Sequence, residues 1–246
     1  PYEFWSTMCN EGELLEKFNI QLTPIPMPEL TDEMKKAKAE GQPVMVETCP
    51  HYLLLDESYV EKYGAYAKCN PALRKKEDVE RLWDYVKDGT VDFIGSDHSP
   101  FLVSEKEKKD KDGNKDIFLS PSGFPGIDLR LPLMITEGLK RGVSLEKIVE
   151  LLSVNPAKLF HIFPQKGTIS AGADGDLVIV DMNKKVTCHA EDSYSQAKGI
   201  MKVYEGWQLD CAVDSTIVRG RVVYENGKVD ESASGWGEFV KPVLKK

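Results

Sequence analysis

The segment Phe93–Pro100 joins an apolar strand pattern to a run of polar side chains that includes Asp97 and His98. In an α/β barrel the active site lies at the carboxyl ends of the strands. An Asp there can bind a metal ion or accept a proton from a metal-bound water. The alternative is an Asp that caps a turn, with its carboxylate satisfied by backbone N–H groups. The residue pattern by itself leaves both interpretations open.

The segment Val46–Leu53 has the same form, because an apolar strand runs into polar residues and Pro50. Cys49 and His51 suggest a nucleophile and its base, but a proline lies between them, so nothing places the imidazole against the sulfur. A lone Cys on a strand is usually a packing residue. We therefore expect Cys49 to be buried and inert.

Two further segments could present polar groups to a small molecule. Pro71 disfavours the helical conformation at Asn70, so that Asn70 could offer its amide and main chain to a ligand. The alternative is a plain turn before the next helix. In Ser122–Asp128 two glycines, Gly123 among them, permit close approach of the backbone to a ligand. They would equally suit a simple junction between a loop and a helix.

The composition restricts the classes of function. The chain has 246 residues, a net charge of −8, 41% hydrophobic and 29% charged residues, which is ordinary for a globular protein. The net negative charge disfavours nucleic acid as a partner. A run of about 18 apolar residues is missing, so we expect no membrane-spanning segment. The first residues lack the basic and apolar regions of a signal peptide.

The cysteines and the charge run give two more expectations. Five cysteines without C-x-x-C spacing argue against a disulfide framework and a zinc ribbon. A reducing, cytoplasmic location is the simplest setting. The dense charge run Ser104–Asp116 mixes Lys with Asp and Glu, which is typical of a solvated loop.

The order of elements predicts an α/β protein. Helices are expected at 31–39, 57–62, 76–86, 126–141, 144–153 and 156–160, and strands at 44–47 and 91–95, with a weaker strand at 19–23. Strands that alternate with helices favour a parallel sheet. A long polar loop is expected at 99–122. The segment 165–230 has closely spaced glycines, short apolar runs and an Asn-Gly turn, and predicts a small all-β unit. We place the domain boundary between residues 164 and 165, giving domains 1–164 and 165–246.

Four motifs then occur in the right order and spacing to resemble one family: Glu47–Leu53 (ETCPHYL), Lys68–Pro71 (KCNP), Gly95–Pro100 (GSDHSP) and Ser122–Gly126 (SGFPG). Together they closely resemble the cyclic amidohydrolases, which include allantoinase, dihydroorotase and hydantoinase/dihydropyrimidinase. The later segments Gly167–Asp181, Tyr204–Trp207 and Thr216–Gly220 look like the C-terminal β unit of the same family.

The resemblance implies the C-terminal part of a (β/α)8 barrel of the TIM type beside a small β-sandwich. It implies two divalent metal ions, zinc being the expected ion, that activate a hydroxide for attack on a ring amide carbonyl, so that the ring C–N bond opens. On this resemblance Asp97 is both the metal ligand and the general base. By position, Asn70, Ser122 and Gly123 would help to hold the substrate ring. His51 lies in a family motif but is not taken as a metal ligand.

The departures from the family pattern concern the metal ligands. The four histidines stand at 51, 98, 161 and 189, and none forms the His-x-His pair of these enzymes. Pro24 falls at about the place of a further metal-binding histidine. One carboxylate cannot hold a binuclear site, so the chain alone is expected to be inactive, with the other ligands in a missing N-terminal portion or a second chain.

Two classes of function stay open. The first is a hydrolase that acts on a small cyclic amide or ureide, with allantoin favoured mildly by the Cys-Pro-His-Tyr and Ser-Asp-His-Ser motifs, and with dihydroorotate or a hydantoin or dihydropyrimidine as alternatives. The second is a non-catalytic homologue that serves as an assembly or scaffold protein. Members of the family are commonly dimers or tetramers, so a homo-oligomer is expected, and neither a membrane nor nucleic acid is expected as a partner.

Overall fold

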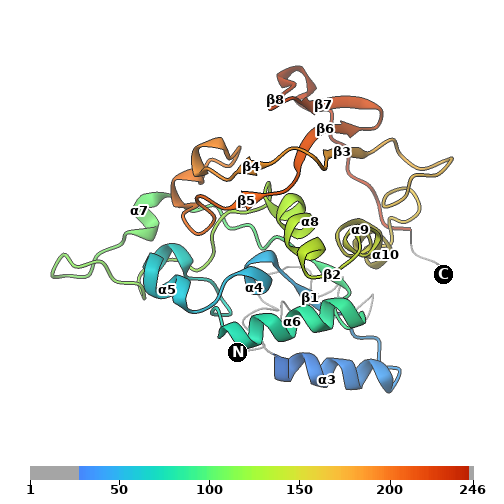
Figure 1. Cartoon of the computed structure of the whole chain (residues 1–246). Coiled ribbons are helices and arrows are strands. Elements are labelled where there is room, and N and C mark those ends of the chain that lie inside the picture. The colour runs from blue at the N-terminus through green and yellow to red at the C-terminus, as the bar shows by residue number, and fades with distance from the viewer. Residues whose placement is uncertain (1–27, 244–246) are drawn as a thin grey trace.

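The computed structural model describes residues 28–243, and Figure 1 traces their path. The weaker strand expected at 19–23 and the proline at position 24 lie outside the described residues. Among the described helices, none has the length and apolar character that a membrane crossing requires. Helices surround a short parallel sheet in one part of the molecule, and antiparallel strands make up the other (Figure 1).

The first part begins with helix α3 (Pro28–Ala39) and strand β1 (Glu47–Thr48). Three helical segments follow: α4 (Pro50–Leu54), α5 (Ser58–Tyr63) and the 3-10 turn η1 (Gly64–Ala67). Helix α6 (Lys76–Asp88) leads to strand β2 (Phe93–Ile94), which pairs with β1 in parallel. The predicted alternation of strands and helices is confirmed, although both strands are shorter than the apolar runs that predict them.

Helix α6 shows why these residues fold as they do. Its buried side chains Val79, Leu82, Trp83 and Val86 recur at the spacing of one helix face. Acidic residues occupy the first turn and Lys87 the last, as the helix dipole favours. The helix ends at Gly89, which adopts the left-handed conformation with φ 85°. The indole of Trp83 donates to the backbone carbonyl of Leu53 at 2.7 Å and so joins α6 to α4.

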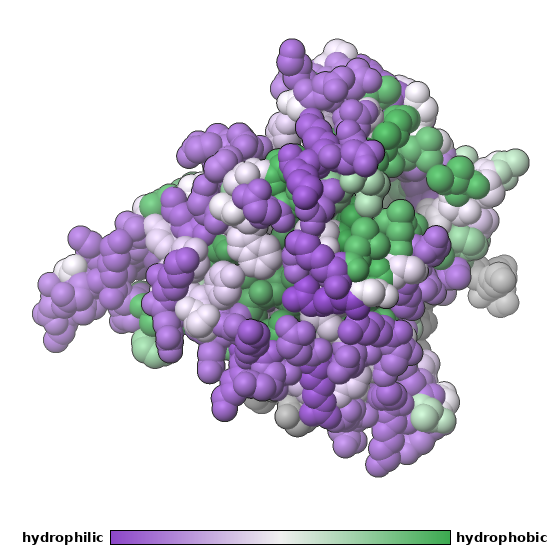
Figure 2. Space-filling model, in the orientation of Figure 1, coloured by the Kyte–Doolittle hydropathy of each residue, from purple (hydrophilic) through white to green (hydrophobic). Residues whose placement is uncertain are grey.

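The segment after β2 differs from its prediction at one residue. The run Ser104–Asp116 was expected to be a solvated loop, and most of it protrudes as a hydrophilic arm (Figure 2). However, it begins inside a short helix, α7 (Val103–Lys106), and Lys106 is buried, with 1% of its surface exposed. The solvated interpretation is therefore wrong for Lys106, because backbone carbonyls from other segments surround its ammonium group.

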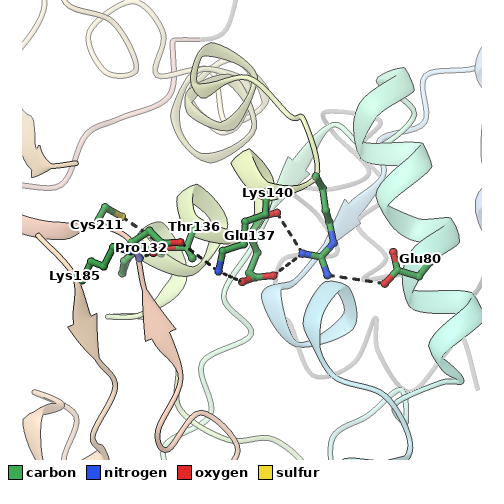
Figure 3. Close-up of polar contacts among 9 residues, drawn as sticks. Glu80, Pro132, Thr136, Glu137, Lys140, Lys185 and Cys211 are labelled. Atoms are coloured by element: carbon green, nitrogen blue, oxygen red, sulfur yellow. Dashed lines mark hydrogen bonds and ion pairs between the residues drawn. The ribbon is translucent and has the colours of Figure 1, made fainter. Parts of the chain in front are cut away.

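Helix α8 (Arg130–Lys140) connects the two parts of the molecule (Figure 3). On one side Arg141 approaches Glu80 of α6, and on the other the Thr136 hydroxyl accepts from the backbone N–H of Asp210 at 3.0 Å. The chain then runs through α9 (Leu145–Val149), the π-turn η2 (Glu150–Val154) and α10 (Asn155–Leu159). The two helices expected here are thus consecutive turns of one helical stretch.

The second part contains two antiparallel sheets. Strands β3 (Leu177–Asp181), β6 (Ala212–Val218), β7 (Arg221–Glu225) and β8 (Lys228–Val229) form one sheet in the order β3-β6-β7-β8. Strands β4 (Val186–Thr187) and β5 (Gln208–Leu209) form the other, and the 3-10 turns η3 (Ala190–Asp192) and η4 (Lys198–Ile200) lie between them in sequence. A last 3-10 turn, η5 (Glu231–Ala233), follows β8. The segment 165–230, which the sequence predicts to be an all-β unit, contains these strands and two 3-10 turns.

One hydrophobic core serves both parts. Leu53, Trp83 and Leu133 from the helices share a cluster with Tyr204 and Leu209 from the second part. The Tyr204 ring meets the Phe124 ring edge to face, with centroids 6.3 Å apart. Phe124 follows Ser122 and Gly123, so this core fixes the loop that carries these two candidate residues.

Candidate functional site

The carboxyl ends of β1 and β2 meet at one edge, because the strands are parallel and Thr48 pairs with Ile94. The ladder continues one residue further, where the N–H of Gly95 donates to the carbonyl of Thr48 at 2.9 Å. Glu47 leans over Gly95, and a Cβ atom at that position would stand 1.9 Å from its Oε1. A residue without a side chain therefore allows the Glu47 carboxylate to lie across the strand ends.

Asp97 lies two residues beyond Gly95, and its backbone has a positive φ of 46°. This conformation is uncommon outside glycine, although Asp tolerates it, and such residues cluster at functional sites. The carboxylate is 36% exposed. Among the described residues no backbone N–H donates to it, so the turn-capping alternative is not what the structure contains. Partial burial raises the pKa of Asp97 to about 6.

Glu47 is the second carboxyl group of this edge. Burial first, and then the negative charge of Asp97, raise the pKa of Glu47 to about 7, while the positive charge of Arg130 offsets part of the rise. Arg130 does not form an ion pair with it among the described residues, and its guanidinium donates instead to the carbonyl of Ile94 at 3.2 Å. Two partly desolvated carboxyl groups thus share the strand ends without a bonded cation.

His51 lies next to the Asp97 carboxylate. Its ring is buried beside Tyr52 and Phe124, with ring centroids at 4.1 and 5.3 Å. Its Nε2 has no hydrogen-bond partner among the described residues, and the Oδ2 of Asp97 is 3.8 Å away. Burial lowers the pKa of His51 to about 3. The ring is therefore neutral and presents one unsatisfied nitrogen toward the site.

Cys49 is not a nucleophile in this arrangement. The thiol is 1% exposed, and burial, followed by the charges of Glu47 and Asp97, raises its pKa well above the usual value. A neutral, enclosed thiol is a packing group, which agrees with the interpretation from sequence.

The candidate substrate residues lie on segments that contact the Asp97 loop. The N–H of Gly123 donates to the carbonyl of Lys68 at 2.8 Å, two residues before Asn70. On its other side Gly123 abuts Ser99, where an added Cβ would be 2.5 Å from the Ser99 side chain, and its φ is 109°. The N–H of Ser99 donates to the carbonyl of Phe124 at 3.2 Å. The segments of Asn70, Asp97 and Ser122–Gly123 therefore run side by side, with Asn70 exposed.

His98 is hydrogen-bonded to the loop that follows Gly123. Its Nδ1 accepts from the backbone N–H groups of Gly126 and Ile127 at 3.2 and 3.4 Å. This pattern holds the loop after Gly123 against the end of β2, so the His98 ring acts on the loop geometry through Nδ1.

A complete metal centre does not form from the described residues. Across residues 28–243, no three His, Cys, Asp or Glu side chains come together in a way that could hold a metal ion. Asp97 supplies one carboxylate, and the Nε2 of His51, which has no hydrogen-bond partner among the described residues, lies 3.8 Å from its Oδ2. Protein zinc sites take three or four ligands. The described donor set therefore does not fit a binuclear centre by itself.

Sequence reasoning missed three residues of this region. Glu47 ends an apolar strand and opens the first family motif, but it was not singled out as a site residue, although an ionisable residue in that position was a usable signal. No sequence pattern marked Arg130, because its hydrogen bond to Ile94 of β2 depends on how α8 packs. Lys106 was hidden inside a charge run.

Comparison with known proteins adds the following. A family model described as "Amidohydrolase family" matches residues 15–223. The L-hydantoinase of Paenarthrobacter aurescens is 38% identical over 216 residues, which cover 87% of this chain and 45% of that protein. A D-phenylhydantoinase of Escherichia coli O1:K1 / APEC is 35% identical over 212 residues, 85% of this chain and 45% of that protein.

Solved structures show the same likeness. The dihydropyrimidinase from Brevibacillus agri NCHU1002 matches with a TM-score of 0.77 and 33% identity over 85% of this chain and 45% of that one. The D-hydantoinase from Thermus sp. matches with a TM-score of 0.78 and 30% identity over 88% of this chain and 47% of that one. The chain thus spans a little less than half the length of these relatives.

Proposed function

The chain belongs to the amidohydrolase family, and we propose that it forms part of a hydrolase that opens the ring C–N bond of a hydantoin or dihydropyrimidine. Hydrolysis of cyclic amide C–N bonds is the reaction class of its named relatives. The single observation that carries the proposal is the Asp97 carboxylate, which lies partly exposed just beyond the carboxyl end of β2 and accepts no hydrogen bond from residues 28–243.

In this proposal Asp97 is the general base and a metal ligand. A carboxylate that accepts no hydrogen bond from the described residues can take up a proton during catalysis. Asn70, Ser122 and Gly123 form the wall that holds the ring. Their neutral amide, hydroxyl and backbone groups match the alternating N–H and C=O groups of a cyclic imide.

The choice of ring follows the relatives. Those compared above are hydantoinases or dihydropyrimidinases. The mild preference for allantoin that the Cys-Pro-His-Tyr and Ser-Asp-His-Ser motifs suggested finds no support in them, so allantoin and dihydroorotate become comparison substrates. A non-catalytic scaffold role also finds no support there.

The metal and the assembly belong to the same proposal. The family is generally metal-dependent, and we propose zinc in a binuclear centre to which the described residues contribute Asp97. The remaining ligands must then come from outside residues 28–243. A domain boundary between residues 164 and 165, a β-sandwich in the second part, assembly into homo-oligomers and a cytoplasmic location complete the proposal.

The test is fragment complementation. The chain is produced alone and together with the part of the Paenarthrobacter L-hydantoinase that it does not match, and both preparations are analysed for zinc. Hydrolysis of a 5-substituted hydantoin, dihydrouracil, allantoin and dihydroorotate is then followed by loss of ring absorbance. We expect zinc and ring opening in the complemented preparation only, with hydantoin or dihydrouracil cleaved fastest.

Each other outcome changes the proposal. Ring opening by the chain alone overturns the incomplete ligand set. Preference for allantoin or dihydroorotate overturns the substrate. A complex that assembles and binds zinc but cleaves none of the four rings overturns the hydrolase assignment and favours the scaffold role.

A further inference from the structure

Lys106 occupies an unusual position for a lysine. It is 1% exposed, and its Nζ donates to the backbone carbonyls of Pro121 at 2.8 Å and Ala65 at 3.1 Å, with Lys68 at 3.5 Å. These carbonyls come from two segments far from α7 in sequence. The ammonium therefore acts as a cation inside a cage of main-chain oxygens.

A second lysine extends the same arrangement. The Nζ of Lys68 donates to the carbonyl of Ser120 at 2.6 Å and to that of Ile117 at 2.8 Å. Its own carbonyl accepts the N–H of Gly123 at 2.8 Å. The Ser120 hydroxyl in turn donates to the carbonyl of Lys106 at 2.6 Å. The two lysine ammonium groups thus hold the backbone carbonyls of Ile117, Ser120 and Pro121.

Packing alone does not require these charges. Neither ammonium forms an ion pair with a carboxylate of the described residues. The Phe101 ring has its centroid 5.6 Å from the Nζ of Lys106. Burying an unpaired charge is expensive, and an apolar side chain would fill the same volume at a lower cost. Burial first, and then the like charge of Lys68, lower the pKa of Lys106 to about 8. Lys106 thus keeps a charged side chain at a position where burial of a charge is costly. This indicates a role for the N–H groups of its ammonium.

The positions of the caged carbonyls show what that role is. Pro121 directly precedes Ser122, and Lys68 lies two residues before Asn70. The contacts of Lys106 therefore connect the two neighbouring segments that form the proposed substrate wall.

We propose that Lys106 is a positioning residue, an internal cation that sets the spacing between the Ser122–Gly123 loop and the Asn70 segment. The assignment of these segments to substrate rests on the proposed function, whereas the cation cage itself does not. The hydrogen bonds of the Lys106 ammonium go to main-chain carbonyls and not to Asp97, so it acts through the main chain.

The test uses the full chain and the exchange of backbone amides. Lys106→Met keeps the volume and removes the N–H donors, and Lys108→Met makes the same change at an exposed lysine of the same charge run. Hydrogen–deuterium exchange of residues 117–123 is measured, with the Gly123 amide as the main reporter. We expect exchange to rise at least tenfold in Lys106→Met and to stay within twofold of the wild type in Lys108→Met. Wild-type exchange in Lys106→Met overturns the proposal.

Chemical rescue distinguishes an effect of the N–H donors of Lys106 from an effect of its charge or volume alone. Lys106→Ala removes the atoms that propylammonium contains, so millimolar propylammonium should restore the protection of Gly123. Tetramethylammonium has the charge but no N–H donor and should not restore it. Equal effects of the two cations, or of neither, overturn the role of the N–H groups.

A measurement on the unchanged protein covers the case in which the variants do not fold. In a sample with ¹⁵N-lysine and ¹³C-carbonyl labels, the Lys106 ammonium should exchange slowly with water and show scalar coupling across its hydrogen bond to the Pro121 carbonyl. Rapid exchange without coupling, as for an exposed lysine such as Lys108, overturns the cage.

The complemented enzyme then tests the link to substrate. Lys106→Met should raise KM at least fivefold and change kcat by less than twofold, because it displaces the wall and leaves Asp97 in place. An unchanged KM with raised Gly123 exchange overturns the substrate role of the loop while the ring-opening proposal stands. Loss of all turnover in the wild type as well would instead count against the proposed function.

Discussion

The carboxyl groups at the ends of β1 and β2 and the carboxyl group of Glu137 on α8 have opposite surroundings. Glu137 accepts from Arg141 at 2.5 Å and from Lys140 at 3.0 Å, part of a chain of polar contacts that extends to Glu80 (Figure 3). Burial pushes its pKa upward, but these hydrogen bonds together outweigh burial and hold the pKa below its usual value. Glu47 is buried beside another carboxylate, and its pKa is raised to about 7.

The difference separates the paired carboxylate of Glu137 from the carboxyl groups at the strand ends, where we propose that Asp97 does chemistry. On α8 the charge of Glu137 is matched by Arg141 and Lys140, so the group strengthens the junction between α6 and the second part of the molecule. At the strand ends neither Glu47 nor Asp97 forms an ion pair with a Lys or Arg of the described residues, and the Nε2 of His51 has no hydrogen-bond partner among them. Buried polar groups that lack the usual hydrogen-bond or ion-pair partners tend to mark functional sites. The comparison predicts that substitutions in the two regions act on different properties.

The largest expected effect is on turnover. In the complemented enzyme Asp97→Asn should lower kcat at least 1,000-fold, about 4 kcal/mol of transition-state stabilisation, because the amide can neither accept the proton nor bind a metal as an anion. Glu137→Gln, the same change on α8, should alter kcat by less than threefold. Both are measured as steady-state hydrolysis of a hydantoin. Comparable losses in the two variants would erase the distinction between the regions.

A control on the fold accompanies this measurement. Asp97 is half-exposed and accepts no hydrogen bond from the described residues, so Asn should fit with little change in the unfolding midpoint. If Asp97→Asn retains near-wild-type turnover, Asp97 is not the general base.

The next largest effect is the pH dependence of stability at Glu47. Its pKa is raised from 4.5 to about 7 in the fold, so the folded state binds more protons than the unfolded state between these values. Its contribution is therefore complete below about pH 4.5 and is lost as the pH rises through about 7. Over that interval the loss amounts to about 3 kcal/mol of unfolding free energy.

The Glu47→Gln variant isolates this contribution. The His51 pKa, lowered to about 3, makes stability change in the opposite direction as the pH rises, and the difference between variant and wild type cancels it. Denaturant unfolding at pH 5 and pH 8 should show the variant gaining stability relative to the wild type as the pH rises. A constant difference would mean that Glu47 titrates normally. The same experiment on Glu137→Gln should show no gain over this range, since the Glu137 pKa lies below its usual value.

The sequence predicts the helices better than it predicts the surroundings of the carboxyl groups at the strand ends. Helix α6 was placed at 76–86 and found at Lys76–Asp88, because its apolar stripe is a local signal. The strands end where apolar residues give way to polar ones, so Asp97 could be singled out. The surroundings of Glu47 could not, because they depend on Gly95 and Asp97, which chain folding brings from another strand.

Lys106 shows the limit most clearly. Its own neighbours in sequence are charged, and they predict exposure. One of the carbonyls that bury its ammonium belongs to Ala65, 41 residues earlier in the chain. A contact that depends on such distant backbone groups leaves no trace in local composition, so a charge run can contain one buried member.

The smallest expected effect is on the stability that the ion pairs of Glu137 give to α8. Glu137→Ala removes the partner of Arg141 and Lys140 and should lower the unfolding free energy by about 1 kcal/mol, the size expected for a partly buried ion pair. A double-mutant cycle with Arg141→Ala, measured by denaturant unfolding at pH 7, gives the coupling directly, and we expect a favourable value of about 0.5–1 kcal/mol. The Arg141 guanidinium also lies 4.9 Å from the centre of the Trp83 ring, and the cycle removes that contact from the result. A coupling near zero would mean that the pairing on α8 contributes no stability, and the contrast with the strand ends would then rest on chemistry alone.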